Sequence, residues 1–236
     1  MKKLFISILL ISSLSPLMAQ VKLAFDKTPR MALDASLASS LSSNALTFSV
    51  NRLHPIAFKG RFSVGYGLRF TGYYGQDNGY VTAPADVSEG NFFKKQNEAK
   101  LDALYLTHSS VGFLNAAVYL DYLLSEKLSL QFNIDAVGFS FGADRSGRYE
   151  ADSENLSSAN EAASVTSVNL LLTGDCDIGS LNSEFSLLYR ISDNMILRTG
   201  VSFVFTEFTT NNKLAFNNDR FRKKSLMPML GFSYLL

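Results

Sequence analysis

The feature that most constrains this 236-residue chain is an alternation of apolar and polar residues with a period of two. From Phe62 to Phe70 the even positions are apolar, and the odd positions between them are small or polar. The same alternation returns at 33–37, 46–50, 114–122, 128–136, 184–190, 197–206 and 225–234. Because successive side chains of a β-strand point to opposite faces, each segment predicts a strand with one apolar face. The sequence therefore predicts an all-β fold of eight strands.

The connections between these segments are of two kinds. Residues 42–44, 125–127 and 192–194 are tight turns, 53–60 is a short loop broken by Pro55, and 211–221 is of medium length. In contrast, 72–109 and 143–180 are long and rich in Ser, Asn, Asp, Glu and Gly. Short turns at one end and long loops at the other are typical of transmembrane barrels. We expect an eight-stranded antiparallel up-and-down transmembrane β-barrel, and 101–107 and 165–172 leave open two extra strands or tall extensions.

The charged residues indicate which face points outward. None of the twelve lysines lies in the middle of a predicted strand, although a water-facing strand surface would normally carry several. The polar face instead carries four acids and four arginines, namely Asp34, Asp121, Asp135 and Glu184 with Arg61, Arg69, Arg190 and Arg198. An eight-stranded barrel is only wide enough for side chains to fill, and buried charges need partners. We therefore favour a lipid-facing apolar surface and a plugged, charge-paired lumen over a soluble barrel of the lipocalin kind.

Aromatic residues mark one edge of the predicted barrel. Tyr122, Tyr189 and Tyr234 all fall at the ends of strands next to short turns. A tyrosine at a membrane surface can keep its ring in the apolar layer and its hydroxyl in water. These three residues are therefore expected to form an interfacial girdle on the periplasmic side.

The start of the chain is typical of an export signal. Lys2 and Lys3 precede an apolar stretch, 4–14, and a cleavage region that ends at Ala19. We expect residues 1–19 to be a signal peptide and 20–236 to be the barrel domain.

The composition excludes two classes of protein. The chain has no run of about 18 apolar residues for a membrane-spanning helix, and its 22 basic and 21 acidic residues give no excess of positive charge for binding nucleic acid. The single cysteine, Cys176, cannot form an intramolecular disulfide.

With these strands, loops and the closing segment Gly231–Leu236, the chain resembles the small Gram-negative outer-membrane β-barrels of the OmpA/OmpX type. The resemblance covers nearly all of the mature chain but rests on pattern, not on a diagnostic motif. It implies an outer-membrane location and assembly by the barrel-assembly machinery. It also implies that the terminal strand carries the assembly signal, here Phe232, Tyr234 and Leu236, although many members end in an aromatic residue where this chain has Leu236.

Few residues are candidates for chemistry. His108 and Ser110, with Asp121 further along, resemble the pattern of the barrel enzyme lipid A deacylase. Asp121 falls thirteen residues from His108, near the opposite end of a strand, which is too far to orient the histidine. Residues 175–179 begin like a calcium loop, but Ser180 and Ser186 stand where the turn glycine and the bidentate glutamate belong. We expect neither catalytic residues nor a metal or cofactor.

The sequence favours a non-enzymatic integral outer-membrane barrel with a structural or surface-interaction role through its long loops. The alternatives are a barrel enzyme acting on lipid A and a narrow porin or transporter. The expected partners are outer-membrane lipid, the barrel-assembly machinery, and an extracellular or membrane protein that contacts 72–109 and 143–180. Within these loops, the aromatic residues Tyr73, Tyr74, Phe92 and Phe93 are expected either to pack the loops together or to anchor a partner.

Overall fold

The computed structural model describes residues 29–83, 101–151, 159–172 and 176–236. The expected signal peptide 1–19, Phe92 and Phe93, and the first residue of the calcium-like segment 175–179 lie outside the described residues. In the described part of the chain, no helix is long and apolar enough to cross a membrane.

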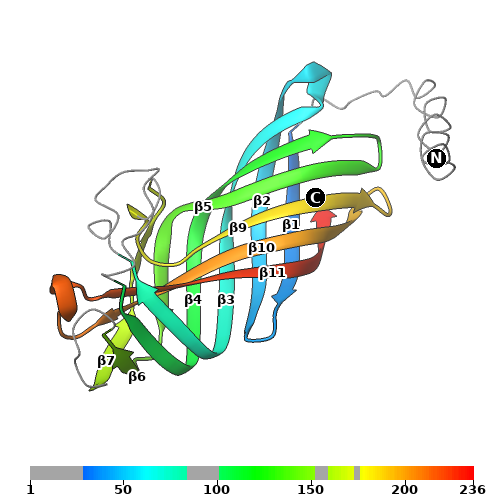
Figure 1. Ribbon diagram of the computed structural model, residues 1–236. Coiled ribbons are helices and arrows are strands. Elements are labelled where there is room, and N and C mark those ends of the chain that lie inside the picture. Colours follow the sequence, from blue (N-terminus) through cyan, green and yellow to red (C-terminus); the bar gives the residue numbers. More distant parts are fainter. Residues whose placement is uncertain (1–28, 84–100, 152–158, 173–175) are drawn as a thin grey trace, which may run out of the picture.

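Eight long antiparallel strands close into a barrel (Figure 1). They are β1 (Arg30–Ser39), β2 (Ser43–Ala57), β3 (Phe62–Thr82), β4 (Ala103–Leu123), β5 (Leu128–Gly142), β9 (Leu181–Arg190), β10 (Met195–Thr210) and β11 (Arg220–Leu235). Each strand pairs with the next in this order, and β11 pairs with β1 to close the ring. The predicted eight-stranded up-and-down barrel is therefore confirmed.

The strand register fixes how the barrel is tilted. A path across paired residues leaves β4 at Tyr122, circles the ring, and returns to β4 at Gly112. It runs through Leu130, Leu187, Thr199, Leu230, Leu37, Leu46 and Gly72. The return point lies ten residues from the start, so the barrel has a shear of ten. With about 3.3 Å per residue and 4.8 Å between strands, this corresponds to a tilt of about 40°, within the range that closed barrels adopt.

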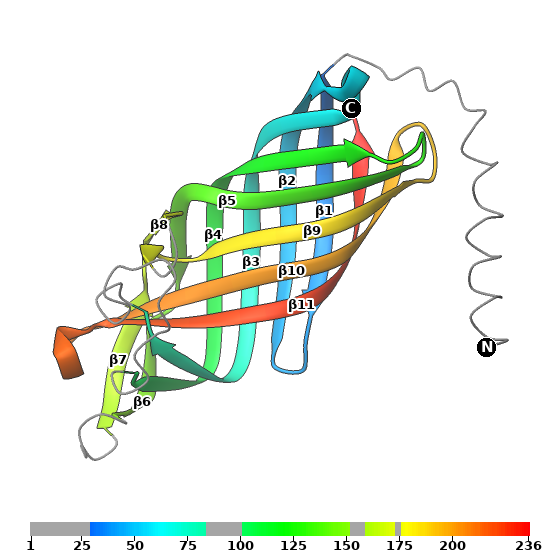
Figure 2. The same cartoon turned by 45° about the horizontal axis from the view of Figure 1, so that its top comes forward.

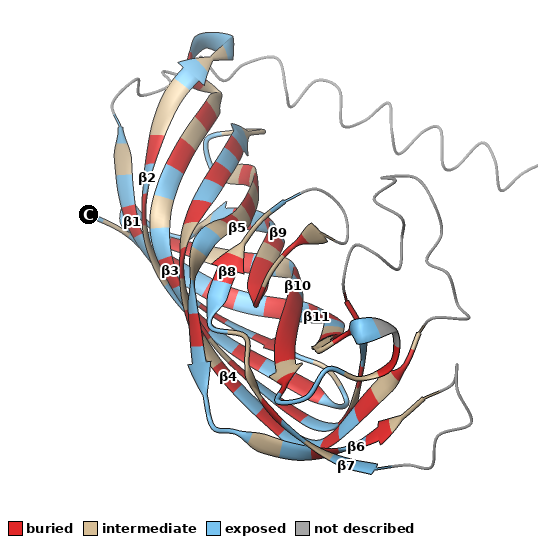
Figure 3. Cartoon of the chain, turned by 90° about the vertical axis from the view of Figure 1, so that its left-hand side faces the viewer, coloured by how far each residue is buried: buried red, intermediate tan, exposed pale blue. Residues whose placement is uncertain are grey.

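The two faces of the wall differ as the alternation predicted (Figure 3). The outward residues are large and apolar and include Leu33, Phe48, Leu68, Leu230 and Phe232, which are 46–56% exposed. The inward residues of the same strands are mostly buried, and many of them are polar. Because apolar side chains on the outer face would be unfavourable in water, this surface suits the hydrocarbon layer of a membrane.

The tight β1–β2 turn lies at one end of the barrel, and the other three short connections gather at the opposite end, together with the C-terminal end of β11 (Figure 2). They are the β4–β5 and β9–β10 turns and η2 (Phe58–Gly60), which links β2 to β3. The expected loop at 53–60 is shorter than predicted, because β2 continues to Ala57. Pro55 is accommodated there by a register shift between Pro55 and Ala57, where the ladder does not require its missing N–H.

The long connections at the other end are largely β-structure instead of loops. β3 and β4 extend far beyond their predicted ends, and the second connection contains β6 (Arg145–Glu150), β7 (Ala159–Val165) and β8 (Val168–Leu170). β6 and β7 form a hairpin between β4 and β10, while η6 (Ala215–Asn217) lies between β10 and β11. Because β3 also pairs with β11, six strands form a second ring above the first. Segment 101–107 thus leads into and belongs to the tall extension of β4, whereas 165–172 runs from the last residue of β7 into β8, which pairs with β5. The main ring has eight strands, so the ten-stranded alternative is wrong.

Candidate functional site

The lower lumen is crossed by two buried arginines. Arg69 on β3 lies 2.7 Å from the carboxylate of Asp135 and 3.7 Å from that of Glu184. It also donates to the Asn133 side chain and to the carbonyl of Asn182. The Arg69 guanidinium therefore joins β3 to β5 and β9 across the interior.

Arg198 on β10 forms ion pairs with β1 and β9 in the same part of the lumen. Its guanidinium lies 2.6 Å from the Asp34 carboxylate on β1 and 3.1 Å from Glu184. Glu184 is thus shared by both arginines, and it also accepts hydrogen bonds from Asn133 at 3.0 Å and Ser36 at 3.1 Å. Together the two arginines and three carboxylates form a network, called here the lumen network, that links opposite walls of the barrel.

Of the other charges expected in the lumen, Asp121 is buried but pairs with Arg30, at 2.8 Å, which the sequence reasoning missed. Arg61 lies between η2 and β3, at the end of the barrel that carries the β4–β5 turn, and donates to the Leu124 carbonyl at 2.8 Å. Arg190 lies half-buried at the last residue of β9. Neither belongs to the lumen network, because both occupy strand ends, where a long side chain reaches toward the turn region instead of the centre.

The lumen leaves little space at the end that carries the β4–β5 and β9–β10 turns. A cavity of about 20 Å³ lies beside Arg30, Asp34, Asn51, Asp121 and Gln131. A buried water molecule needs a cavity of roughly 10–15 Å³, so this cavity holds about one water molecule. The Oδ1 of Asn51 and the Oε1 of Gln131 are buried without a protein partner and are suited to bind that water.

The upper lumen is filled mainly by apolar and aromatic side chains, with hydrogen-bonded polar groups among them. Its buried side chains form one cluster, called here the upper core, which includes Tyr80, Leu104, Leu106, Phe113, Tyr149, Phe208, Phe221 and Met227. Tyr80 and Phe208 meet edge to face with ring centroids 5.2 Å apart, and the Tyr80 hydroxyl contacts the Thr206 hydroxyl at 3.1 Å. The six-stranded ring is therefore filled like the core of a soluble domain.

A second ionic cluster lies on the outer face of β10 and β11. Glu207 is fully buried there between Arg220 at 2.8 Å and Arg222 at 2.7 Å. Both arginines also donate to the carbonyl of Asp177, and Gly179 donates its N–H to Glu207 at 3.3 Å. The segment that leads into β9 is therefore held against the outside of the upper ring. The sequence signal that could have indicated this cluster is Glu207, an acidic residue at an outward position of β10.

The residues that resemble lipid A deacylase do not come together. His108 and Ser110 are exposed on the outer face of β4, and the His108 ring stacks on Tyr74 with its Nδ1 3.3 Å from the tyrosine hydroxyl. Asp121 lies inside the barrel at the other end of β4, paired with Arg30. Tyr74 is thus part of an outer-surface contact, whereas Tyr73 is buried inside and bonds to Ser43 at 2.8 Å.

The three tyrosines that are expected to form a girdle all lie on the outer face of the barrel. Tyr122, Tyr189 and Tyr234 lie near those ends of β4, β9 and β11 where the short β4–β5 and β9–β10 turns are found, and are 36%, 48% and 50% exposed. Phe232 and Leu236, the other residues of the expected assembly signal, are 49% and 64% exposed. No metal-binding group of three or more His, Cys, Asp or Glu residues is found among the described residues.

No protein family model and no curated protein matches the chain. Among solved structures, it is similar to Ail of Yersinia pestis, seen in a phospholipid bilayer nanodisc, at 11% identity over 89% of this chain and 100% of that chain, with a TM-score of 0.37. Neisserial surface protein A matches at 9% identity over 87% and 94%, with a TM-score of 0.36. A major outer membrane protein of Thermus thermophilus matches at 12% identity over 89% and 100%, with a TM-score of 0.38. The closed ring of eight strands with its apolar exterior gives the chain the architecture of a small outer-membrane β-barrel.

Proposed function

We propose that the protein is a closed, non-enzymatic outer-membrane barrel whose role is structural or is exerted by its extracellular extension. The observation that carries this proposal is the filling of the lumen at two levels. The lumen network spans the lower part from wall to wall, and the upper core fills the ring above it. A solute would have to break buried ion pairs and then displace packed aromatic side chains.

The outer surface, the terminal strand and the upper ring of the barrel each suggest a different partner. We propose that lipid covers the apolar outer surface and that the barrel-assembly machinery recognises the terminal strand. The surface available to an external partner is the upper ring with the β6–β7 hairpin, which includes most described residues of 72–109 and 143–180. The ionic cluster around Glu207 supports this role, because it holds the connecting segment in a fixed position and so provides a rigid surface.

Conductance in planar lipid bilayers tests the closed lumen. The purified barrel is expected to insert without steady single-channel currents, whereas a water-filled porin reconstituted in parallel conducts. The reason is that opening the lower lumen would leave Arg69 or Arg198 unpaired in a dry interior, at a cost of about 3–5 kcal/mol. Stable, uniform channel openings by the unmodified protein would instead support the narrow porin.

A further inference from the structure

A furrow crosses the lipid-facing side of the barrel wall over β2, β3 and β4. It has a volume of about 550 Å³, and most of the residues that line it are apolar. The strand register aligns its lower part, since Arg52 pairs with Tyr66, and Tyr66 pairs with Val118. Higher in the wall, Leu68 pairs with Ala116 in the same way. The furrow therefore begins at Arg52 and continues up the wall to Ala116.

The hollow results from two alanines that face outward next to each other. Ala116 on β4 and Ala136 on β5 both line the furrow, whereas Leu68 and Val118 beside them project with 55% and 42% exposure. The register between β4 and β5 also shifts here and leaves Ala136 without a partner on β4. Such a bulge bends its strand and increases the local twist. The small side chains and the bulge together leave a depression between taller neighbours.

Arg52 is the one charged residue that lines the furrow. Its side chain is exposed on the outer face of β2, and its neighbours across the ladder, Met31 and Tyr66, carry no charge. The acids of β1 and β4, Asp34 and Asp121, point into the lumen and pair with arginines there. Among the described residues, Arg52 thus faces no carboxylate and places an unpaired cation at the lower end of the furrow.

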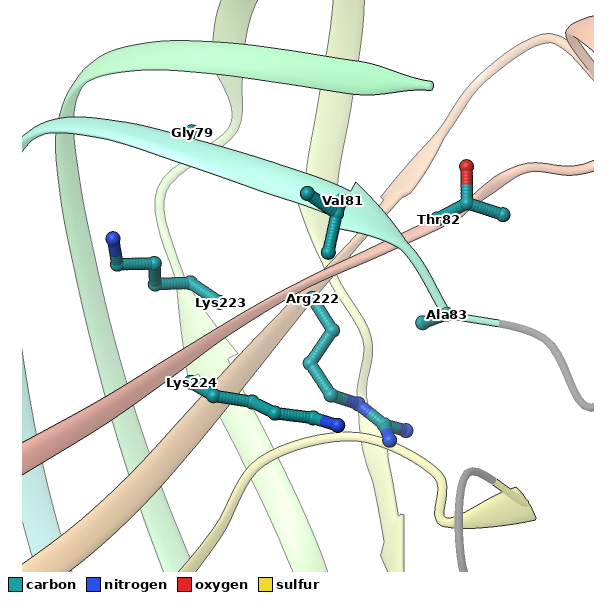
Figure 4. A pocket seen from close by; sticks show the side chains of 7 residues that line it. All are labelled: Gly79, Val81, Thr82, Ala83, Arg222, Lys223 and Lys224. Carbon is teal, nitrogen blue, oxygen red and sulfur yellow. The ribbon is translucent and has the colours of Figure 1, made fainter. Parts of the chain in front are cut away.

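A smaller hollow higher in the wall lacks this property. It lies where β3 and β11 meet, has a volume of about 270 Å³, and includes Arg222 and Lys224 in its lining (Figure 4). Arg222 is paired with Glu207 at 2.7 Å, and Lys224 also interacts with another group of the protein. The basic side chains of that hollow are therefore already engaged, in contrast to Arg52.

The height of Arg52 places it at the membrane surface. The path around the ring climbs from β4 toward β5, so each step from β4 toward β2 descends by about 3 Å at the tilt given above. Val118 lies four residues, or about 10 Å in height, above the expected girdle residue Tyr122. Arg52 lies two steps from Val118, which puts it about 4 Å above the level of Tyr122. An expected girdle marks the level of the lipid headgroups.

The upper end of the furrow lies near the middle of the membrane. Ala116 is six residues above Tyr122 on the same strand, which corresponds to about 15 Å in height. The apolar band of a transmembrane barrel is about 25 Å tall. The furrow therefore spans the depth of one leaflet, with its cation at the headgroups and its alanines among the ends of the acyl chains.

We propose that the furrow binds one phospholipid of the leaflet that surrounds the end of the barrel with the β4–β5 turn. The phosphate is held by Arg52, because a guanidinium donates two parallel hydrogen bonds to phosphate oxygens. One acyl chain lies along the furrow and fills the depression at Ala116 and Ala136. The other occupants that an apolar furrow could hold, such as a second copy of this chain, do not require a cation at its lower end.

Tyr66 supports the headgroup from the neighbouring strand. It is 61% exposed and lies beside Arg52, so its hydroxyl can donate to the same phosphate. The His54 ring stacks on Tyr66 with ring centroids 5.8 Å apart and holds the tyrosine in place. The proposal rests on the membrane placement of the barrel and not on its closed lumen, so lipid binding and conductance can fail independently.

Native mass spectrometry of the full mature protein in uncharged detergent micelles tests this site. The probes are dioleoylphosphatidylglycerol, dioleoylglycerol, which lacks the phosphate, and glycerol phosphate, which lacks the acyl chains. Arg52→Gln removes the cation, and its control Lys127→Gln removes an exposed cation from the β4–β5 turn at the same end of the barrel. Ala116→Leu fills the depression, and its control Ala35→Leu enlarges an outward alanine of β1 that does not line the furrow.

The wild-type protein and both controls are expected to hold one phosphatidylglycerol more tightly than any further lipid. Arg52→Gln should bind this first lipid about fivefold more weakly, because a basic residue near an anionic lipid surface contributes about that factor. Ala116→Leu should also weaken it several-fold, and Arg52→Lys should retain most of the binding. The gel mobility shift between unboiled and boiled samples verifies that each variant is folded, and the two test variants address opposite ends of the furrow independently.

Three results would overturn the proposal. The first is equal affinity of the wild type and both test variants for phosphatidylglycerol, and the second is equal affinity of the wild type for dioleoylglycerol. The third is glycerol phosphate that binds as tightly as the lipid, which would indicate a site for a free anion. A lipid-free dimer that is lost in Ala116→Leu would overturn it as well, in favour of a second copy of the chain in the furrow.

Discussion

At the scale of single residues, the lumen network contains more carboxylates than arginines. Two arginines, Arg69 and Arg198, face three carboxylates, those of Asp34, Asp135 and Glu184. Glu184 touches both arginines, which makes it the apparent centre of the network. The negative charge of Glu184 is nevertheless not needed to pair the arginines. When Glu184 is neutral, Arg69 still pairs with Asp135 and Arg198 still pairs with Asp34.

Neutralising Glu184 should therefore cost less than removing an arginine. Glu184→Gln keeps an oxygen for Arg198 and Asn133, and its new amide can donate to the Ser36 hydroxyl, so we expect a loss of about 1 kcal/mol in the free energy of unfolding. Arg198→Met leaves the Asp34 carboxylate without its cation and should cost about 3–5 kcal/mol. Urea unfolding of both variants in lipid vesicles measures the difference. Equal losses would show that hydrogen bonding, not charge balance, governs the lumen network.

At the scale of elements, the upper ring should behave as a separate packing unit. It consists of β6, β7 and the upper parts of β3, β4, β10 and β11, and its stability depends on the upper core. Phe208 is fully buried in that core, and Phe203 on the same strand faces outward with 37% exposure. The two residues offer a matched pair for separating the ring from the barrel below.

Phe208→Ala should loosen the upper ring and spare the lower barrel. Removing a buried phenylalanine costs about 3–5 kcal/mol, and here the cavity would lie beside Tyr80 and next to the β7–β10 pairing. Amide hydrogen exchange should become faster in 145–150 and 159–165, while the lower half of β10 stays protected. The control Phe203→Ala should leave exchange in the upper ring unchanged. Faster exchange throughout the barrel in Phe208→Ala would argue against two packing units.

The sequence predicted the lower barrel well and the upper ring poorly, for a physical reason. Lipid outside and charges inside impose a strict period of two, which is readable without any partner strand. The extensions are covered by water outside, and their composition between 72 and 109 is that of loops. Tyr80, Phe208 and Phe221 become a core only through pairings between distant segments. In addition, the buried positions on β3 change from odd to even numbers around Asp77, which has a φ of 47°. Such non-local contacts leave no local signal.

At the scale of the whole molecule, closure of the barrel depends on the last strand. β11 pairs with β1 from Ala32–Leu235 to Ala38–Met229, and the N–H of Leu236 donates to the Met31 carbonyl at 3.0 Å. The ring therefore stays open until the terminal strand is in register. The shear of ten requires this register, since a slip by one residue would turn the outward side chains of β11 into the lumen.

The proposed assembly signal on this strand can be separated from simple membrane stability by a matched pair of variants. Phe232→Ser/Tyr234→Ser removes two outward aromatic residues from β11, and Phe185→Ser/Tyr189→Ser removes the same residue types, with 50% and 48% exposure, from β9. Both pairs lose similar lipid contact, so both should fold with similar yield in pure lipid vesicles. When the vesicles contain the barrel-assembly machinery, only the β11 variant should fold several-fold more slowly, because only it alters the strand that is recognised. The measurement is the fraction of heat-modifiable barrel over time, and an equal slowing of both variants would locate the effect in membrane insertion instead of recognition.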